Sequence, residues 1–559
     1  MTDSAHGPAA GIGLRKGRGA SSLSILALVL ALVLMSPIVT VAFAIFGGGG
    51  DTWAHLARTV LPRYIGNTVA LAVIVTIGTF LLGTATAWVV TMCRFPGRKF
   101  FEWALVLPLA MPAYVIAYAY TEFLSHPGPV QTLLREVTGW GPRDYWFPNV
   151  RSLQGAAIMF ILVLYPYVYL LARSAFLKQS VHAFDVGRTL GRTPFGAFVE
   201  VALPLARPAI ATGVALALME TLADFGTVAH FGVQTFTTGI YRSWFNMGDR
   251  IAAAQLSSVL LAFVILIVSL ERWNRGAARV DAADTHRAPP EFPLTGRKAA
   301  GAMLLCGLPF VLGFVLPVVL LLQLAISGGH LMPTARYVSN AVNSVIAAGV
   351  GAVVTVALAV VLAYAGRLAP SRLTGIATRL SSFGYAVPGS IIAVGLLIPL
   401  TRFDTVFSDW MYESFAIDTG QILTGTIVAL IFAYAVRFMS VALNTVESSL
   451  AKITPNMDQA ARTLGETGGG VLWRIHLPLM AGGLMTAALI VFVDIMKELP
   501  ATIIMRPFNF DTLAVHAYQL AADERLSEAA VPSLTIVAVG IVPVILLSRQ
   551  ISKTRVSGA

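Results

Sequence analysis

The chain alternates long apolar runs with short polar segments, and the runs are too long for the core helices of a soluble protein. A helix needs about 20 mostly apolar residues to cross about 30 Å of hydrocarbon. About twelve runs meet this length, near residues 22–46, 66–92, 101–124, 152–175, 205–229, 251–270, 300–326, 341–365, 381–400, 421–446, 479–504 and 530–548. The pattern therefore predicts an all-α integral membrane protein with about twelve transmembrane helices.

The composition agrees with this pattern. The chain of 559 residues is 56% hydrophobic and 12% charged, whereas soluble proteins carry about 25% charged residues. A chain this apolar cannot cover its own surface in water, so membrane lipid must surround much of it. We therefore exclude a disordered chain, a fibrous repeat and a soluble nucleic-acid-binding protein, and we expect no nucleic-acid partner. Cys93 and Cys306 are far apart in the sequence and have no metal-ligand spacing.

The distribution of basic residues predicts the orientation of the chain. The first apolar run follows Arg15, Lys16 and Arg18 and is too long for a secretory signal, so we interpret it as a retained first span. With the N-terminus inside, the inner segments hold about 26 of the 39 basic residues and the outer loops about 11. Because basic residues favour the cytoplasmic side, we predict that both termini are cytoplasmic.

The chain contains an internal repeat. Residues 187–208 and 461–482 share Arg-Thr-Leu-Gly and Leu-Pro-Leu at an offset of 274 residues, which is the separation of Gly191 and Gly465. Further pairs at this register, within two residues, are Asn67 with Asn343 and Asp224 with Glu498.

The repeat divides the chain into two copies of six spans each. We predict a first repeat over 1–270, a polar, proline-containing linker over 271–298 and a second repeat over 299–559. Because six is an even number, both copies face the same way, and such parallel repeats are related by an axis along the membrane normal.

Two inner loops, 176–204 and 450–478, are more regular than simple connections. Each has helix-forming stretches, one glycine, nine further residues, an apolar residue and then Leu-Pro. A glycine permits a tight reversal between short helices, and a proline suits the first turn of the next span. The second loop has Gln459, Ala460, Ala461, Gly465, Leu477 and Pro478 in this pattern, and the first has Asp185, Gly191, Leu203 and Pro204.

These loops resemble the cytoplasmic loop of ABC importer permeases, which reads Glu-Ala-Ala, three residues, Gly, nine residues, Ile, one residue and Leu-Pro. Because the pattern occurs twice, the chain resembles a fused pair of type I importer permease subunits in the inner membrane. The resemblance implies that each loop forms a coupling helix seated in a groove of an ATPase subunit, so we expect two ATPase copies. The chain departs from the pattern where Gln459 replaces the acid, with Asp458 adjacent, and where the first copy lacks the alanine pair.

The chain carries no nucleotide site of its own, because no Gly, four residues, Gly-Lys-Ser/Thr motif is present. We therefore expect a transport permease that is not an enzyme and binds no cofactor, with ATP and Mg²⁺ held by the partner ATPase subunits.

Two pairs of acidic residues lie inside apolar runs, where charges are costly and are functional hypotheses by default. Glu220 and Asp224 are four residues apart in the fifth run, so we expect them on one helix face. Asp494 and Glu498 hold the equivalent places in the eleventh, and the two pairs are predicted to meet between the repeats. Oxygen ligands suit a hard metal cation, so all four are candidate translocation-path and metal-binding residues. Alternatively, Lys497 and Arg506 neutralise these acids in a structural role.

The segments around these acids resemble ferric-iron ABC permeases. The resemblance covers residues 219–228 and 234–244 in the first repeat and 497–502 and 506–514 in the second. It implies ferric iron as cargo and an extracytoplasmic substrate-binding protein as a partner. Thiamine and a phosphonate stay open as alternative cargos. An ion-coupled secondary transporter, in which the carboxylates would carry protons, stays open as a different class.

Overall fold

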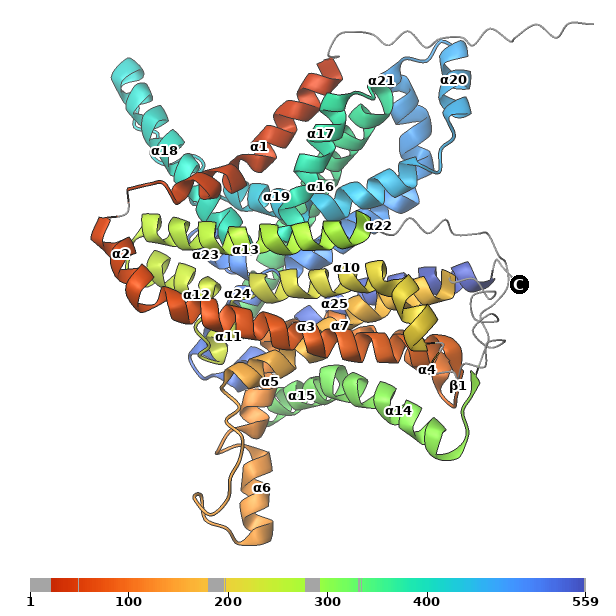
Figure 1. Cartoon of the computed structure of the whole chain (residues 1–559). Coiled ribbons are helices and arrows are strands. Elements are labelled where there is room, and N and C mark those ends of the chain that lie inside the picture. The colour runs from red at the N-terminus through yellow and green to blue at the C-terminus, as the bar shows by residue number, and fades with distance from the viewer. Residues whose placement is uncertain are drawn as a thin grey trace, which may run out of the picture.

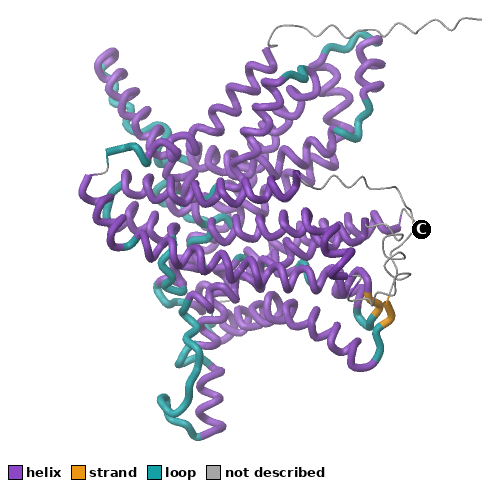
Figure 2. Tube along the Cα trace, viewed as in Figure 1, coloured by secondary structure: helices purple, strands orange, loops and turns teal. Residues whose placement is uncertain are grey.

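The computed structural model describes residues 22–48, 50–178, 196, 198–276, 292–329, 332 and 334–556. These residues are almost entirely helical (Figures 1 and 2). Because the bilayer core offers no water to hydrogen-bond the backbone, long apolar segments satisfy their N–H and C=O groups within helices. The fold is therefore the all-α membrane architecture that the apolar runs predict.

The first half contains helices with the following bounds: α1 (Ser22–Ala44), α2 (Gly50–Thr59), α3 (Leu61–Met92), α4 (Arg98–Ala104), η1 (Leu107–Ala110), α5 (Ala113–Leu124), α6 (Pro129–Thr138), α7 (Leu153–Lys178), η2 (Phe198–Ala202), α10 (Leu203–Ala223), α11 (Gly226–His230), α12 (Phe236–Tyr241), η3 (Arg242–Asn246) and α13 (Arg250–Gly276). A short strand, β1 (Cys93–Arg94), follows α3.

The second half contains β2 (Phe292–Pro293), α14 (Gly296–Phe310), η4 (Val311–Val315), α15 (Leu316–Ser327), α16 (Ala335–Leu368), α17 (Arg372–Ser381), η5 (Ser382–Ala386), α18 (Gly389–Phe415), α19 (Ile427–Leu450), α20 (Pro455–Thr463), α21 (Gly468–Val471), η6 (Leu472–His476), α22 (Leu477–Met496), α23 (Pro500–Met505), α24 (Leu513–Ala522) and α25 (Leu526–Val556). The segments η1 and η5 are 3₁₀ helices, and the other η segments are π-helical.

Eleven helices among the described residues are long and apolar enough to cross a membrane, and a bent pair makes twelve if it counts as one span. Each predicted apolar run coincides with one of them. The run at 101–124 is the bent pair, in which Arg98–Ala110 and Ala113–Thr138 meet at 91°. Proline lacks an N–H and disfavours helical backbone at the preceding residue. Met111, just before Pro112, is accordingly extended, with φ −92° and ψ 112°.

Two predicted runs end earlier than the sequence indicated. The fifth and eleventh runs were expected to reach residues 229 and 504, but their helices end at Ala223 and Met496. A short second helix, α11 or α23, follows each break. Hydrophobicity continues across both breaks, so the apolar pattern did not reveal them.

Each half is built on three mutually packed helices: α3, α7 and α10 in the first, and α16, α19 and α22 in the second. The first span of each half crosses over to the other half. Helix α1 packs against α17 and α18 of the second half, while α15 packs against α5 of the first half as well as against α25 of its own half. The hydroxyl of Tyr120 in α5 donates to the carbonyl of Leu312 in η4 at 2.8 Å. The two repeats of the sequence are thus interleaved in space.

Equivalent residues of the two repeats make equivalent contacts. The Asn67 amide donates to the carbonyl of Gln234 at 2.9 Å, and the Asn343 amide donates to the carbonyl of Asp511 at 3.1 Å. Each bond ties an early turn of α3 or α16 to the loop before α12 or α24. The asparagine pair found by sequence register therefore has the same role in both halves.

The described end of the predicted linker lies against the first half. Strand β2 pairs in parallel with β1, and the N–H of Leu294 donates to the carbonyl of Arg94 at 2.9 Å. The chain therefore enters the second half beside the C-terminal end of α3.

Candidate functional site

A cavity of about 110 Å³ lies between the two halves and is lined by both. All four predicted carboxylates, Glu220, Asp224, Asp494 and Glu498, are among its lining residues. The other polar or aromatic lining residues include Tyr114, Tyr167, Tyr385, Arg437 and Lys497. The structure thus brings the two acidic pairs to one place, 274 residues apart in sequence.

Interrupted helices meet at this cavity. Met111 and Pro112 lie at the bend before α5, Asp224 at the end of α10, and Lys497 and Glu498 after α22. Non-helical backbone at membrane depth is tolerated where it is buried in protein or lines a cavity. The breaks therefore surround the cavity that the four predicted carboxylates line.

Asp224 is a helix cap. Its backbone is extended, with φ −70° and ψ 137°. One carboxylate oxygen accepts from the N–H of Thr227 at 2.8 Å and of Val228 at 3.3 Å, and the other accepts from the Thr227 hydroxyl at 2.9 Å. The N–H of Asp224 still donates to the carbonyl of Glu220 at 3.0 Å, and both side chains line the same cavity, which agrees with the expectation that they share one face. The carboxylate competes for backbone donors as a cap does, and the chain leaves the helix at that point.

Glu498 repeats this arrangement in the second half. Its two carboxylate oxygens accept from the N–H of Ala501 at 2.9 Å and of Thr502 at 3.0 Å, and the Thr502 hydroxyl donates at 2.6 Å. Only 4% of Glu498 is exposed. The side chains of Asp224 and Glu498 thus accept hydrogen bonds from the first turns of α11 and α23 in the same way, as their places in the repeat imply.

Of the two basic residues that the sequence suggested as partners of the intramembrane acids, one lies beside them and the other does not. Lys497 pairs with Asp494, with 2.9 Å between Nζ and Oδ1, whereas Arg506 pairs with Asp511 at 2.6 Å, away from the cavity lining. Arg437, from α19, lies 3.8 Å from Glu498 and was not predicted. It is a charged residue inside an apolar run, and that signal marks a functional candidate.

Glu220 differs from the other three carboxylates. It accepts a hydrogen bond from the Tyr385 hydroxyl at 3.4 Å, and among the described residues it makes no ion pair. The described residues contain no group of three or more His, Cys, Asp or Glu arranged to hold a metal ion. Direct metal ligation by the four carboxylates therefore stays a prediction.

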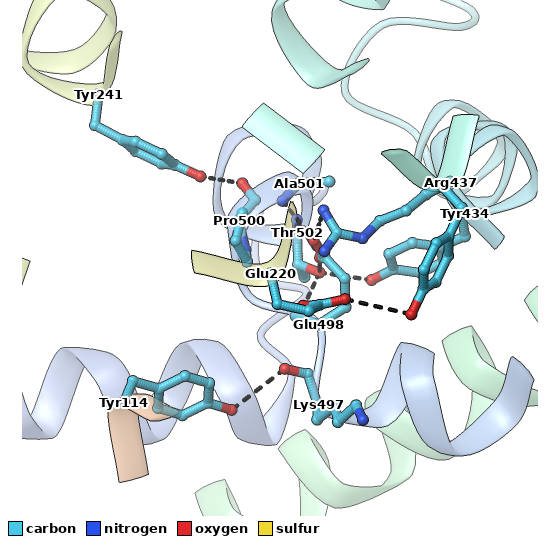
Figure 3. A network of polar contacts seen from close by, with 11 residues as sticks. Tyr114, Glu220, Tyr241, Tyr434, Arg437, Lys497, Glu498, Pro500, Ala501 and Thr502 are labelled. Carbon is cyan, nitrogen blue, oxygen red and sulfur yellow. Dashed lines mark hydrogen bonds and ion pairs between the residues drawn. The ribbon is translucent and has the colours of Figure 1, made fainter. Parts of the chain in front are cut away.

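Tyrosines join the two halves at the cavity (Figure 3). The Tyr114 hydroxyl donates to the carbonyl of Lys497 at 3.4 Å, and the Tyr241 hydroxyl donates to the carbonyl of Pro500. Lys497 lies in the break between α22 and α23, and Pro500 is the first residue of α23. These bonds, with the Tyr385–Glu220 bond, cross from one half to the other.

The predicted second coupling loop is a compact helical segment. Gln459, Ala460 and Ala461 lie in α20, and Leu477 and Pro478 begin α22. Gly465 forms the turn with φ +85°, a conformation that favours glycine. The N–H of Glu466 donates to the carbonyl of Ala461 at 3.1 Å and closes the turn. The geometry of this segment agrees with the predicted reversal.

Part of the first loop can be compared. Asp185 and Gly191 lie outside the described residues. Leu203 and Pro204 begin α10 directly after η2, just as Leu477 and Pro478 begin α22 after η6. The Leu-Pro elements of both repeats thus have the same structural place.

Asp458 is held by side chains of α16 and of the segment itself rather than presented to solvent. Arg367 donates from Nε and Nη2 to its two oxygens at 2.9 and 3.1 Å, and Nε2 of His476 lies 2.7 Å from one of them. Burial raises the pKa of the Asp458 carboxyl, but the hydrogen bonds from Arg367 and His476 outweigh burial and hold it below its usual value. Sequence reasoning noted Asp458 only as a neighbour of Gln459.

Comparison with known proteins identifies the class. Residues 79–276 and 355–555 each match the family described as the binding-protein-dependent transport system inner membrane component. The chain is 28% identical over 505 residues to the Fe(3+)-transport system permease protein FbpB 2 of Haemophilus influenzae, covering 89% of this chain and 92% of that protein. It is 23% identical over 530 residues to the ferric transport system permease protein FbpB of Actinobacillus pleuropneumoniae, covering 89% and 73%.

A relative that matches a shorter part of the chain is named for a different cargo. The molybdenum transport system permease protein ModB of Escherichia coli is 25% identical over 197 residues, which is 34% of this chain and 83% of that protein. A ModB-sized chain therefore corresponds to about one repeat of this one.

This chain belongs to the family of binding-protein-dependent transport system inner membrane components, with the family domain present twice. It is accordingly a multi-pass membrane permease with two fused halves, and not an enzyme. The family assignment decides against the ion-coupled secondary transporter, because members work in transport systems that depend on a binding protein.

Proposed function

We propose that this chain is the transmembrane permease of an ATP-driven importer that carries ferric iron from an extracytoplasmic binding protein into the cytoplasm. The observation that carries the proposal is the acidic lining of the cavity between the halves. The names of the iron-transport relatives, which match along almost the whole chain, support it.

The charge of the cavity favours a cation. Four carboxylates face only two basic side chains, Arg437 and Lys497, among the lining residues. In a site shielded from water such an excess of one sign attracts the opposite charge and repels the same charge. A phosphonate would bring further negative charge, so this lining disfavours that alternative. Carboxylate oxygens are the hard ligands that a ferric ion prefers.

Three of the four carboxylates already have hydrogen-bond or ion-pair partners within the protein. This supports passage of the cation rather than its tight binding. Asp224 and Glu498 already accept backbone hydrogen bonds, and Asp494 is paired with Lys497. Among the described residues, the hydrogen bond that Glu220 accepts is the long one from Tyr385. We therefore propose that Glu220 meets the cation first and that the other acids follow as the halves move.

Two copies of an ABC ATPase subunit, with their ATP and Mg²⁺, are proposed to seat on segments 176–204 and 450–478. In the second segment the exposed side chains include Met457, Gln459 and Leu464, the last 85% exposed. A large exposed apolar side chain beside polar ones is typical of a docking surface. The distribution of basic residues, which predicts cytoplasmic termini, supports a cytoplasmic position for both segments, on the side of the ATPases.

In this mechanism ATP-driven closure of the ATPases moves both segments together and shifts the halves between two arrangements as rigid bodies. The binding protein and ATP must favour different arrangements for transport to proceed. The tyrosine bonds across the cavity break and form in each cycle.

The test is cargo uptake by proteoliposomes that contain the full chain with its ATPase and binding protein. We expect ATP-dependent uptake of radioactive ferric iron but not of 2-aminoethylphosphonate or thiamine. The double variant Glu220→Gln with Glu498→Gln should lose about tenfold or more of iron uptake, the size expected when contacts to charged groups worth about 1.5–3 kcal/mol are removed. ATPase binding should be unchanged.

The matched control is Glu413→Gln, because Glu413 is an exposed acid of α18 that is not among the cavity-lining residues. It should transport iron as the unmodified chain does. Full iron uptake by the double variant, or uptake of thiamine in place of iron, would contradict the proposal.

A further inference from the structure

The second coupling segment is fastened to the membrane helices by one arginine. Arg367 lies in the last turn of α16, and Asp458 lies in the first turn of α20. Both are mostly buried, with 15% and 16% of their side chains exposed. Nε and Nη2 of Arg367 bind the two oxygens of Asp458 in the two-pronged geometry that gives strong, directional charge-assisted hydrogen bonds.

Arg367 also binds the end of a second membrane helix. Its Nη1 donates to the carbonyl of Leu450 at 2.8 Å, and its Nη2 donates to the carbonyl of Ile453 at 2.9 Å. Leu450 is the last residue of α19. Carbonyls at a helix end lack helical partners, and a basic group there is favourable. Arg367 thus joins the inner ends of α16 and α19 to α20.

A third membrane helix is joined through histidine. His476 is fully buried, and its Nε2 lies 2.7 Å from Oδ1 of Asp458. It immediately precedes α22. The Tyr364 ring packs edge-on against His476, and the Tyr364 hydroxyl donates to the carbonyl of Gly468 at 2.6 Å. Asp458 is therefore the point at which α20 meets all three packed helices of the second half.

The first repeat has no equivalent of these residues at the 274-residue offset. Cys93, Phe184 and Ala202 occupy the places of Arg367, Asp458 and His476. In the described part of that half, the rings of Trp88, Phe176 and Phe198 pack together at the inner ends of α3 and α7. At these three places the first repeat therefore has no charged side chain.

We propose that Asp458, Arg367 and His476 form a rigid attachment that transmits movement of α20 to α16, α19 and α22, and that Asp458 is a positioning residue for coupling rather than a contact to the ATPase. This inference rests on the proposed function, because it assumes an ATPase seated on α20. It also accounts for the neutral Gln459 in the acidic place of the pattern, because the neighbouring acid has an internal role.

The test uses the complete transporter in lipid nanodiscs, with spin labels at Glu122→Cys and Arg402→Cys. These exposed positions lie in α5 and α18, in opposite halves. The separation of the two labels is measured with and without ATP, and ATP hydrolysis is measured in parallel. We expect ATP to change the separation in the otherwise unmodified chain. Asp458→Asn should reduce that change at least fivefold while the ATPase stays bound and hydrolyses ATP.

A matched control is available in the same segment. Glu466 and Arg474 form an ion pair at 2.6 Å that does not reach the three packed helices. Glu466→Gln should leave the ATP-driven separation unchanged. The exchange of charges, Arg367→Asp with Asp458→Arg, should restore part of the movement that Asp458→Asn loses. Arg367→Lys keeps the charge but not the two-pronged geometry, so it tests the attachment should Asp458→Asn fold poorly.

Three outcomes would overturn the inference. Asp458→Asn and Arg367→Lys could both move as the Glu466→Gln control does. Asp458→Asn could release the ATPase, which would make Asp458 a docking contact. The charge-exchanged double variant could fail to restore any of the ATP-driven movement while Arg367→Lys moves as the unmodified chain does. Failure of the proposed function looks different, because the otherwise unmodified chain would then show no ATP-driven movement or no iron uptake.

Discussion

The carboxylate of Glu220 in the first half accepts a hydrogen bond from the hydroxyl of Tyr385 in the second half, with 3.4 Å between the two oxygens. This contact crosses the cavity that all four intramembrane acids line. Among the described residues, Glu220 is the one carboxylate of the four that neither caps a helix nor forms an ion pair. The bond from Tyr385 joins it to the opposite half. Separation of the halves therefore frees Glu220, which links the position of the helices to the availability of an acid.

We predict that Tyr385→Phe makes separation of the halves easier. The loss of one hydrogen bond removes about 0.5–1.5 kcal/mol of contact between the halves, which should raise resting ATP hydrolysis several-fold. Tyr434→Phe is the control, because the Tyr434 hydroxyl bonds Thr502 within the second half at 2.8 Å. Equal rates for the two variants would show that the bond across the cavity has no special role.

Gly389→Ala should displace side chains that line the cavity, because there is no room for the added methyl group. A Cβ at Gly389 would lie 2.6 Å from Nη1 of Arg437 and 2.7 Å from Oε1 of Glu498. Overpacking of this kind costs about 1–3 kcal/mol, so we expect a lower unfolding temperature and impaired iron uptake. Gly349→Ala, in α16, has no atom within 4 Å of the added carbon and should not destabilise the protein. A Gly389→Ala protein as stable and active as the Gly349→Ala protein would contradict this account.

Gly465 permits a test of backbone conformation alone. Its φ is +85° and no atom lies within 4 Å of an added Cβ, so any effect of substitution reflects the left-handed backbone. Gly465→Val should cost about 1–2 kcal/mol or more in the turn and raise the ATP consumed per ion transported. Gly465→Asn should be milder, because asparagine adopts this conformation more readily. The prediction fails if valine and asparagine behave alike.

The attachment of α20 should be insensitive to pH near neutrality and weaken only in acid. The pKa of Asp458 is held below its usual value in the folded protein. Its stabilising contribution is therefore complete above the ordinary aspartate pKa of about 3.9 and is lost as pH falls through the lowered value. Mobility of a spin label at Asn456→Cys, in α20, should rise only below about pH 4. A transition near pH 6–7 would instead point to an imidazole.

Local features of the sequence were sufficient for much of the architecture. The apolar runs anticipated every candidate span among the described residues, because a helix that crosses lipid needs a length that is visible in the chain. The turn at Gly465 and the start of α22 at Leu477 also followed from local rules for glycine and proline. The family match covers both halves, as the repeat predicted.

Charge partners were harder to anticipate. Lys497 was expected near Asp494 and lies there, three residues away, but Arg506 pairs with Asp511 instead. Arg437 reaches Glu498 from another helix. Spacing along a helix predicts neighbours within one or two turns only, so partners from distant segments cannot be read from it.

The sequence by itself determined the membrane class, the repeat and the identity of the four intramembrane acids, because each of these depends on composition or on short-range pattern. Only the tertiary structure decided that α1 crosses to the other half, that Asp224 and Glu498 cap broken helices around one cavity, and that Asp458 faces inward. Those features depend on packing between segments far apart in the chain. In that packing, backbone donors freed by a helix break and charges removed from water take whichever partner the fold brings within reach.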